Sequence, residues 1–305
     1  MENDPRKAPI AGESQPILPA HHGPLDAIAL LEARPADQRE RLERLAALLI
    51  AANRRLNLTA VTDPAEVRVR HLADSLAALP LIAALAPYPT RAADGVPELV
   101  DLGSGGGFPG LALAIALPEW RVVSVEATAK KARFQESAVE ALGLTNVEVV
   151  CERIEAVGRR PEFRERFALA TARALAALNV VAELALPLVA VGGHVLAWKG
   201  RRVDEEIVAG RAACTALGGK VAGMVRYRIE EGERRKAEGE TAEAGTGTRT
   251  TEGRTQEAES AGRAESDLRI VVIEKLAACP RVYPRNAGAM AKRPLGAERG
   301  GREKT

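Results

Sequence analysis

The stretch LVDLGSGGGFPG, residues 99–110, places a glycine-rich turn directly behind a short apolar run. The apolar run reads as a strand, and a helix is expected to begin near Pro109. Gly103 to Gly107 then form the turn between them. Because glycine has no Cβ, a ligand can lie directly against this backbone. The stretch therefore predicts a ligand-binding turn between a strand and a helix of an α/β fold.

The turn fits two ligand classes. In one register, Gly105, Gly107 and Gly110 match the GxGxxG fingerprint of dinucleotide-binding folds, with Glu126 after the next strand as the acid that binds a ribose. This reading predicts an NAD(P)-dependent oxidoreductase, which stays as an alternative.

In the other register, Asp101 precedes Gly103, Gly105 and Gly107, the pattern of class I methyltransferases. Their loop carries the amino-acid part of S-adenosylmethionine. A pyrophosphate prefers an uncluttered helix N-terminus, whereas the ammonium group of that amino acid benefits from an acidic neighbour such as Asp101. We therefore expect S-adenosylmethionine as the cofactor and Asp101, Gly103, Gly105 and Glu126 among its ligands.

Short β-branched runs alternate with helix-length segments after the turn. The expected strands cover residues 98–102, 121–126, 146–151, 167–172 and 194–198. The expected helices cover residues 109–117, 129–142, 179–190 and 203–217. Two last runs, 220–229 and 267–276, have no helix between them and predict an antiparallel hairpin. The pattern predicts a doubly wound, mostly parallel seven-stranded sheet covered on both faces.

Residues 36–80 are expected to form an N-terminal helical cap. Leu42, Leu45 and Leu49 recur at the spacing of an amphipathic helix. A second helix is expected after Asp63, a capping residue followed by Pro64 at the first helical position.

The expected organisation is one methyltransferase domain over residues 25–295, with a Rossmann-like core over 97–283. Residues 1–24 are charged and proline-rich and are expected to be a disordered leader, and 296–305 a disordered tail. Residues 230–267 contain no Val, Ile, Leu, Met or aromatic side chain, which predicts a disordered insertion in the hairpin loop.

Composition limits the function classes. The chain has 305 residues, 46% of them hydrophobic, so a sizeable core is possible. Lys and Arg total 43 against 41 for Asp and Glu, which excludes a strongly basic coat and makes any nucleic-acid footprint local. Three separated cysteines without CxxC spacing predict neither a disulfide framework nor a metal site. No signal peptide or membrane span is indicated, and a cytoplasmic protein is expected.

Several separated motifs resemble one family. They are NLTAVTDPAEVRVRHLADSL (57–76), DLGSGGGFPG (101–110), ERIE (152–155), TARALAALN (171–179), WKG (198–200) and YPRNAGAMAKRPL (283–295). In this order they resemble the bacterial 16S ribosomal RNA guanine-N7 methyltransferases, also called glucose-inhibited division protein B. The resemblance covers about residues 36–295 except the insertion, and Thr171 stands where the family often has serine.

The resemblance implies methyl transfer from S-adenosylmethionine to N7 of a guanine in 16S rRNA. Carried over by position, the residues around the cofactor are Gly103, Phe108, Glu126, Ile154, Glu155 and Arg173. The pair Ile154 and Glu155 is expected to frame the adenine. The implied partner is 16S rRNA or the small ribosomal subunit, and we expect a monomer without metal. A noncatalytic RNA-binding protein on the same fold is a further alternative.

The residues agree with N7 chemistry. Methylation of an exocyclic amine usually goes with a D/N-P-P-Y/F motif after the fourth strand, and methylation of a pyrimidine carbon needs a nucleophilic cysteine. This chain has TARALAALN at that position instead. Guanine N7 offers a lone pair and loses no proton, so alignment with the methyl donor suffices and no general base is predicted.

Basic residues at several positions are candidates for RNA contact. The candidates are Arg68, Arg70, His71, Arg173, Lys199, Arg285 and Lys292. The tail supports this assignment, because residues 280–305 hold seven Lys or Arg against two Glu, a local surplus suited to phosphates. His71 equally fits a packing role at a helix interface.

Overall fold

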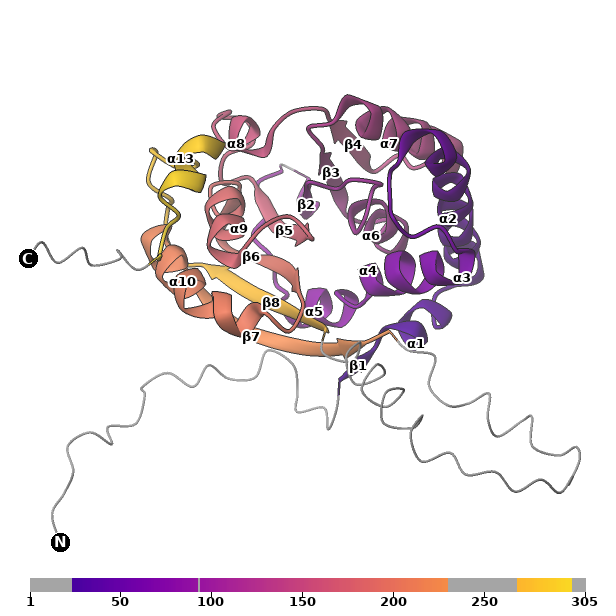
Figure 1. The fold of residues 1–305 in the computed structure, drawn as a ribbon, viewed down its shortest axis with the longest axis horizontal. Helices are drawn as coiled ribbons and strands as arrows, with labels where there is room; N and C mark the ends of the chain where they lie inside the picture. The colour runs from indigo at the N-terminus through magenta and orange to yellow at the C-terminus, as the bar shows by residue number, and fades with distance from the viewer. Residues whose placement is uncertain (1–23, 93, 230–267, 298–305) are drawn as a thin grey trace, which may run out of the picture.

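The protein is built around one mixed sheet with helices on both faces (Figure 1). The structure is a computed structural model that describes residues 24–92, 94–229 and 268–297. The strands follow the order β1-β7-β8-β6-β5-β2-β3-β4. Their bounds are β1 Leu25–Asp26, β2 Glu98–Leu102, β3 Arg121–Val125, β4 Val147–Val150, β5 Phe167–Arg173, β6 Val189–Lys199, β7 Gly219–Arg228 and β8 Leu268–Lys275.

The sheet confirms the predicted architecture and corrects the strand count. Strands β6, β5, β2, β3 and β4 run parallel, and β8 pairs antiparallel with both β6 and β7. The sheet has eight strands rather than seven, because the two residues of β1 pair in parallel with the edge strand β7. Such a short strand at an exposed edge has no sequence pattern of its own.

Twelve helical segments surround the sheet in the described part of the chain. They are α1 Ala27–Glu32, α2 Ala36–Leu56, α3 Pro64–Val67, the π-helix η1 Arg68–Ala73, α4 Asp74–Leu76, α5 Leu79–Ala84, α6 Gly110–Ala116, α7 Ala129–Leu142, α8 Ile154–Val157, α9 Leu178–Ala185, α10 Val203–Ala216 and α13 Ala287–Lys292. The predicted helix at 179–190 is too long, since α9 ends at Ala185 and β6 begins at Val189.

Alternate residues of each strand pack into two separate cores. Leu99 and Val122 face the core under α1, α2, α6 and α7, whereas Val100 and Val123 face the core under α9 and α10. A strand that is buried on both sides reads as a continuous apolar run, which is what residues 98–102 show.

The helical cap forms as its sequence predicts. Leu42, Leu45 and Leu49 of α2 are fully buried. The Asp63 carboxylate accepts a hydrogen bond from the Glu66 N–H at 2.9 Å and caps α3, with Pro64 as the first helical residue.

The expected insertion at 230–267, most of the leader and most of the tail lie outside the described residues. Within the described ranges, no helix is long and apolar enough to cross a membrane.

Candidate functional site

The glycine turn lies between β2 and α6, as predicted. Gly103, Gly105 and Gly107 have positive φ angles of +67°, +58° and +90°, a region that disfavours residues with a Cβ. The Gly103 N–H donates to the Val125 carbonyl at 2.9 Å, which ties the turn to the end of β3.

Asp101 lies beneath the turn and lines neither of the two cavities beside it. Its side chain is fully buried and accepts hydrogen bonds from the Gly110 N–H at 2.9 Å and the Thr171 hydroxyl at 2.8 Å. Burial raises the pKa of this carboxyl to about 6. The two carboxylate oxygens thus join the turn, α6 and β5, and the contact between Asp101 and the ammonium group of a ligand stays a prediction. Thr171 supplies the same hydroxyl as the serine common in the family.

Glu126 follows β3 and reaches the turn from the other side. Its two carboxylate oxygens accept the Gly105 N–H at 2.9 Å and the Thr128 N–H at 2.7 Å. It is 6% exposed, and it lines the larger cavity. The carboxylate thus lies at the surface of a cavity while it also holds the glycine backbone in place.

Gln135 of α7 is a buried polar residue that the sequence analysis missed. Its side-chain amide donates to the Gly105 carbonyl at 2.8 Å, and its carbonyl accepts from the Ser124 hydroxyl at 2.6 Å. The sequence holds a signal for this buried role, because Gln135 lies on the same face of the helix as the buried residues Ala132 and Ala138. A polar residue on such a face indicates a buried partner.

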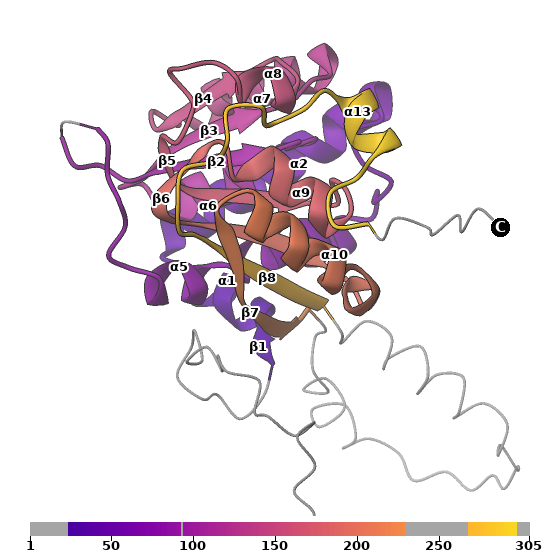
Figure 2. The ribbon, with the colours of Figure 1, turned by 90° about the vertical axis from the view of Figure 1, so that its left-hand side faces the viewer.

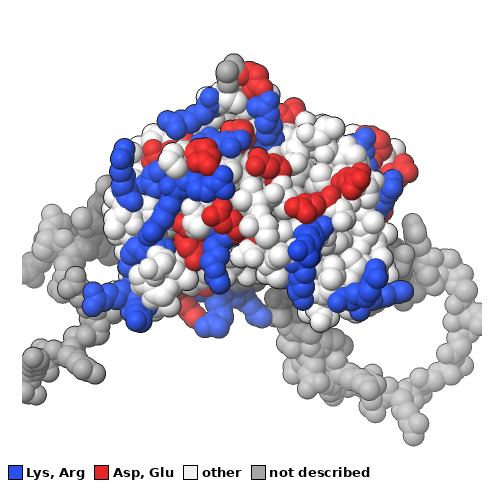
Figure 3. Space-filling model, turned by 90° about the horizontal axis from the view of Figure 1, so that it is seen from above, with Lys and Arg blue, Asp and Glu red and all other residues white. Residues whose placement is uncertain are grey.

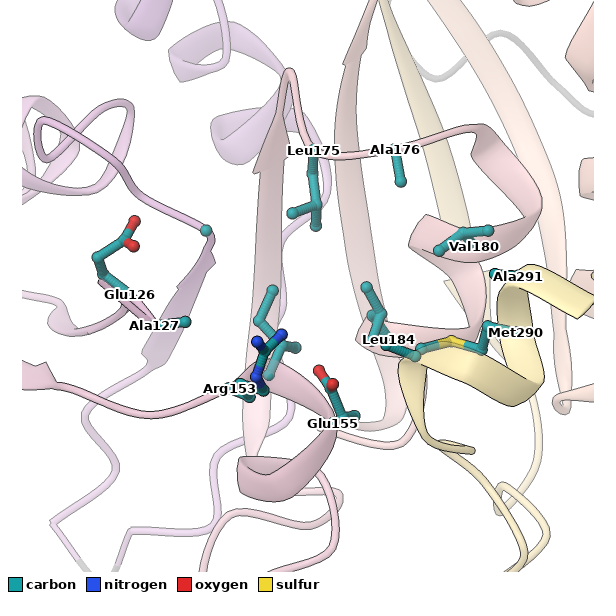
Figure 4. A pocket seen from close by; sticks show the side chains of 13 residues that line it. Glu126, Ala127, Arg153, Glu155, Leu175, Ala176, Val180, Leu184, Met290 and Ala291 are labelled. Atoms are coloured by element: carbon teal, nitrogen blue, oxygen red, sulfur yellow. The ribbon is translucent and has the colours of Figure 1, made fainter. Parts of the chain in front are cut away.

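The larger cavity opens between the ends of β3 and β5, α8, α9 and α13 (Figure 4). Its volume is about 440 Å³. Its lining residues are Gly103, Glu126, Ala127, Arg153, Ile154, Glu155, Leu175, Ala176, Val180, Leu184, Ala287, Met290 and Ala291. The walls are mostly apolar, with two carboxylates and the guanidinium of Arg153, a lining that suits an uncharged heterocycle carrying hydroxyl groups. The predicted pair of Ile154 and Glu155 begins α8 at this cavity.

The C-terminal segment forms one wall of the larger cavity, which the sequence analysis did not predict. Figure 2 shows this segment rising from the end of β8 and passing over to α13 on the side that faces the viewer. Arg285 makes two hydrogen bonds of 2.7 and 2.6 Å to the carboxylate of Glu183, which is only 1% exposed. Arg164 donates to the carbonyl oxygens of Tyr283 and Cys279. These contacts hold α13 so that Met290 and its neighbours face the cavity.

The smaller cavity lies on the other side of the turn and shares Gly103 with the larger one. Its volume is about 210 Å³. Its lining residues are Leu49, Leu58, Thr59, His71, Gly103, Ser104, Gly105, Gly106, Phe108, Lys131, Arg173 and Ala174. Two cations line this cavity, Lys131 and Arg173, and the charge of Arg173 is shared with Asp74. The cavity therefore suits a ligand group that carries a negative charge.

His71 and Arg173 form one polar cluster with Phe108 at the smaller cavity. The His71 ring stacks on Phe108 at 5.0 Å between centroids, and Arg173 pairs with Asp74 at 2.6 Å. Arg173 also donates to His71 Nδ1 at 3.2 Å, so we assign the ring proton to Nε2, which donates to the Thr59 hydroxyl at 2.8 Å. Burial and the neighbouring Arg173 lower the pKa of His71 to about 4. His71 is therefore neutral at physiological pH.

The structure separates the predicted RNA contacts into exposed and internally bonded residues. Lys199 donates to the Ala176 carbonyl and the Glu206 carboxylate, both at 2.6 Å, and its side chain is only 9% exposed. Arg285 is the anchor of the C-terminal segment. Arg68 is bonded to Glu43 at 2.9 Å, whereas Lys292 is exposed at the end of α13.

Charges of both signs cover the face that points up in Figure 1. Figure 3 shows many Lys and Arg side chains there, with Asp and Glu scattered between them. This distribution agrees with the near-neutral composition and gives no continuous basic coat. Among the residues that the structure describes, no group of three or more His, Cys, Asp and Glu side chains could hold a metal ion.

The glycine turn at the carboxyl ends of a doubly wound sheet, with an acid after β3 and an antiparallel β8, defines a class I S-adenosylmethionine-dependent methyltransferase. The family model GidB, described as rRNA small subunit methyltransferase G, matches residues 38–235. The chain belongs to this family.

Curated relatives carry the same description. A protein named ribosomal RNA small subunit methyltransferase G from Rubrobacter xylanophilus is 40% identical over 251 residues, which cover 82% of this chain and 81% of that protein. One of the same name from Roseiflexus castenholzii is 39% identical over 261 residues, covering 85% and 93%. A crystal structure of MtNAS in complex with MTA and tNA matches with 16% identity and a TM-score of 0.43, over 79% of this chain and 71% of that one.

Proposed function

We propose that this protein transfers a methyl group from S-adenosylmethionine to N7 of a guanine in 16S ribosomal RNA, as a monomer in the cytoplasm. The family membership supports the ribosomal RNA as substrate. The observation that carries the proposal for the cofactor is the pair of cavities that meet at Gly103.

The two cavities fit the two halves of S-adenosylmethionine. We assign the adenosine to the larger cavity, where Glu126 and Glu155 offer carboxylate oxygens to ribose hydroxyls and Ile154 and Leu175 offer apolar surface. We assign the amino-acid half to the smaller cavity, where Lys131 and Arg173 face its carboxylate. When bound, the cofactor would supply a methyl group on a sulfonium, and Gly103, which lines both cavities, would lie beside it.

The same contacts disfavour a dinucleotide. A pyrophosphate in a GxGxxG turn needs free N–H groups at the glycines and at the following helix. Here the Gly105 N–H is bonded to the Glu126 carboxylate, and the Gly110 N–H to the Asp101 carboxylate. Neither of these two N–H groups is therefore free to bind a phosphate.

The cysteines support an attack by the substrate itself rather than by an enzyme nucleophile. Cys214 is fully buried, and burial raises the pKa of its thiol to about 12. Burial also raises the pKa of Cys279. Cys151 is exposed and lines neither cavity. Since guanine N7 already carries its lone pair, the protein has to align the acceptor with the methyl group, and it needs no group that removes a proton.

The direct test uses small ribosomal subunits that lack the modification. The purified protein and radiolabelled S-adenosylmethionine are incubated with these subunits, and the label is mapped by cleavage at N7-methylated guanines. We expect label at one guanine of 16S rRNA. Label on another atom, or no label with subunits or free rRNA, would contradict the proposal.

A further inference from the structure

A groove with an apolar floor and a basic rim lies between α2 and α7. Its volume is about 420 Å³. Leu48, Ala52 and Phe134 contribute to the floor, and Arg55, Lys130 and Arg133 stand on the rim. All three cations are exposed.

The rim cations differ from most of the cations that the sequence singled out for RNA. Arg68, Lys199 and Arg285 each have a carboxylate partner within the protein. Across residues 24–92, 94–229 and 268–297, Arg55 and Arg133 make no side-chain hydrogen bond and no ion pair, and the same holds for Lys130. Their charge is therefore available to an anion from outside.

The two rim cations on α7, Lys130 and Arg133, lie near the N-terminus of the helix, where a positive charge is electrostatically unfavourable. Lys130 and Lys131 lie in the first turn of this 14-residue helix, Arg133 follows directly, and no acidic residue occupies that turn. The positive end of the helix dipole repels cations there. Cations kept at an unfavourable position, without internal partners, indicate an external anionic ligand.

The groove and the smaller cavity lie on neighbouring faces of α2 and α7. Neighbouring residues of α7 divide between the two, since Lys130 lines the groove and Lys131 lines the cavity. On α2, Leu48 lines the groove and Leu49 lines the cavity. A polymer bound in the groove therefore lies beside the cavity that borders the glycine turn.

We propose that the groove between α2 and α7 binds the phosphodiester backbone of the RNA substrate, with Arg55, Lys130 and Arg133 as phosphate ligands. The inference rests on the proposed function and adds the surface on which the RNA lies. The three cations of the rim supply the positive charge that binds phosphates.

The test compares two double variants that lose the same charge. The groove variant is Arg55→Gln with Arg133→Gln. The control is Arg211→Gln with Arg226→Gln, two exposed arginines on α10 and β7, on the opposite side of the molecule (Figure 1). Binding of the full chain to unmodified small subunits is measured between 50 and 300 mM salt, and S-adenosylmethionine affinity is measured by calorimetry.

We expect the groove variant to bind the subunit about 10- to 30-fold more weakly near physiological salt, with a salt-dependence slope lower by about 1.5 to 2, because two phosphate contacts are lost. Its affinity for S-adenosylmethionine and its melting temperature should equal those of the control. Equal loss of RNA binding in both variants, or an unchanged slope in the groove variant, would overturn the groove assignment.

Failure of the groove assignment can be distinguished from failure of the proposed methyl transfer. If the wild-type protein methylates subunits and the groove variant behaves like the control, the groove assignment fails while the function stands. If the wild-type protein transfers no methyl group to any subunit, the proposed function fails first.

Discussion

The two cavities that meet at Gly103 are built from different parts of the chain and carry different chemistry. The larger one is formed by loops after the strands and by α13, and its polar groups include the carboxylates Glu126 and Glu155. The smaller one is closed by the N-terminal helices and faces the cations Lys131 and Arg173. The common core of the fold supplies the shared turn, and the segments added at the two ends of the chain supply the outer walls. Gly103 belongs to both halves of the site, whereas Arg285 supports the larger cavity and Lys131 lines the smaller one.

Replacement of Gly103 by valine should damage both halves at once. A Cβ there would lie 2.8 Å from Leu175 Cδ1, so Leu175 would be pushed toward the larger cavity, and the positive φ of +67° adds strain. We expect S-adenosylmethionine affinity to fall about 1,000-fold, a loss of about 4 kcal/mol, in calorimetry.

Gly143→Ala is the matched control. Gly143 also has a positive φ, +62°, but no atom lies within 4 Å of its added Cβ. This variant should lose about 1 kcal/mol of unfolding free energy and keep its cofactor affinity. Unchanged binding by Gly103→Val would remove the turn from the site.

Arg285→Ala should affect the larger cavity alone. It leaves the buried Glu183 carboxylate without its cationic partner, so we expect the free energy of unfolding to fall by about 3 kcal/mol and α13 to detach. The affinity for free adenosine should fall. Free methionine should compete with S-adenosylmethionine as strongly as it does in the wild-type protein. Equal weakening of both ligands would show that the two cavities do not act separately.

Two neighbouring lysines test the smaller cavity. Lys131 lines it and Lys130 does not, although both lie in the first turn of α7. Lys131→Gln should weaken S-adenosylmethionine binding about tenfold through loss of a charged hydrogen bond. Lys130→Gln should leave that affinity unchanged in the same calorimetric titration, and an equal effect of both would contradict the assignment.

The smallest expected effect is the pH dependence of wild-type stability from two groups near the turn. The pKa of His71 is lowered to about 4, so its contribution is present above its unfolded value near 6.5 and is lost as pH falls through 4. The pKa of Asp101 is raised to about 6, so its contribution is present below 3.8 and is lost as pH rises through 6. Each amounts to about 3 kcal/mol, and the two nearly cancel between pH 4 and 6.

The variant Asp101→Asn removes one of the two opposing contributions to the unfolding free energy and leaves that of His71. Its unfolding free energy, measured by denaturant titration, should rise more steeply from pH 4 to 6 than that of the wild type, because only the His71 contribution remains. Parallel pH profiles for the two proteins would show that Asp101 titrates at its ordinary pKa.

Local patterns in the sequence predicted the elements of the site but not the partners of its charged groups. The glycine turn, the cap at Asp63 and the carboxylate of Glu126 follow from residues near one another in the chain, and the structure has them where expected. Arg285 and Glu183 are 102 positions apart, and only the tertiary fold brings them together.

Asp101 shows the same limit within the motif itself. Its position in the pattern was recognised, but whether its carboxylate faces a ligand or the backbone depends on Thr171 of β5 and on the N–H of Gly110. For a related reason, the sequence did not show which of the candidate RNA contacts are paired with a carboxylate inside the protein. A basic residue has the same sequence signature whether an acid lies beside it in the fold or not.

A crystal structure with S-adenosylhomocysteine tests the central claim most directly. We expect the adenosine among Glu126, Ile154 and Glu155, the homocysteine carboxylate facing Lys131 and Arg173, and the sulfur beside Gly103. A ligand with both halves in the larger cavity, or one that leaves the smaller cavity to solvent, would contradict it.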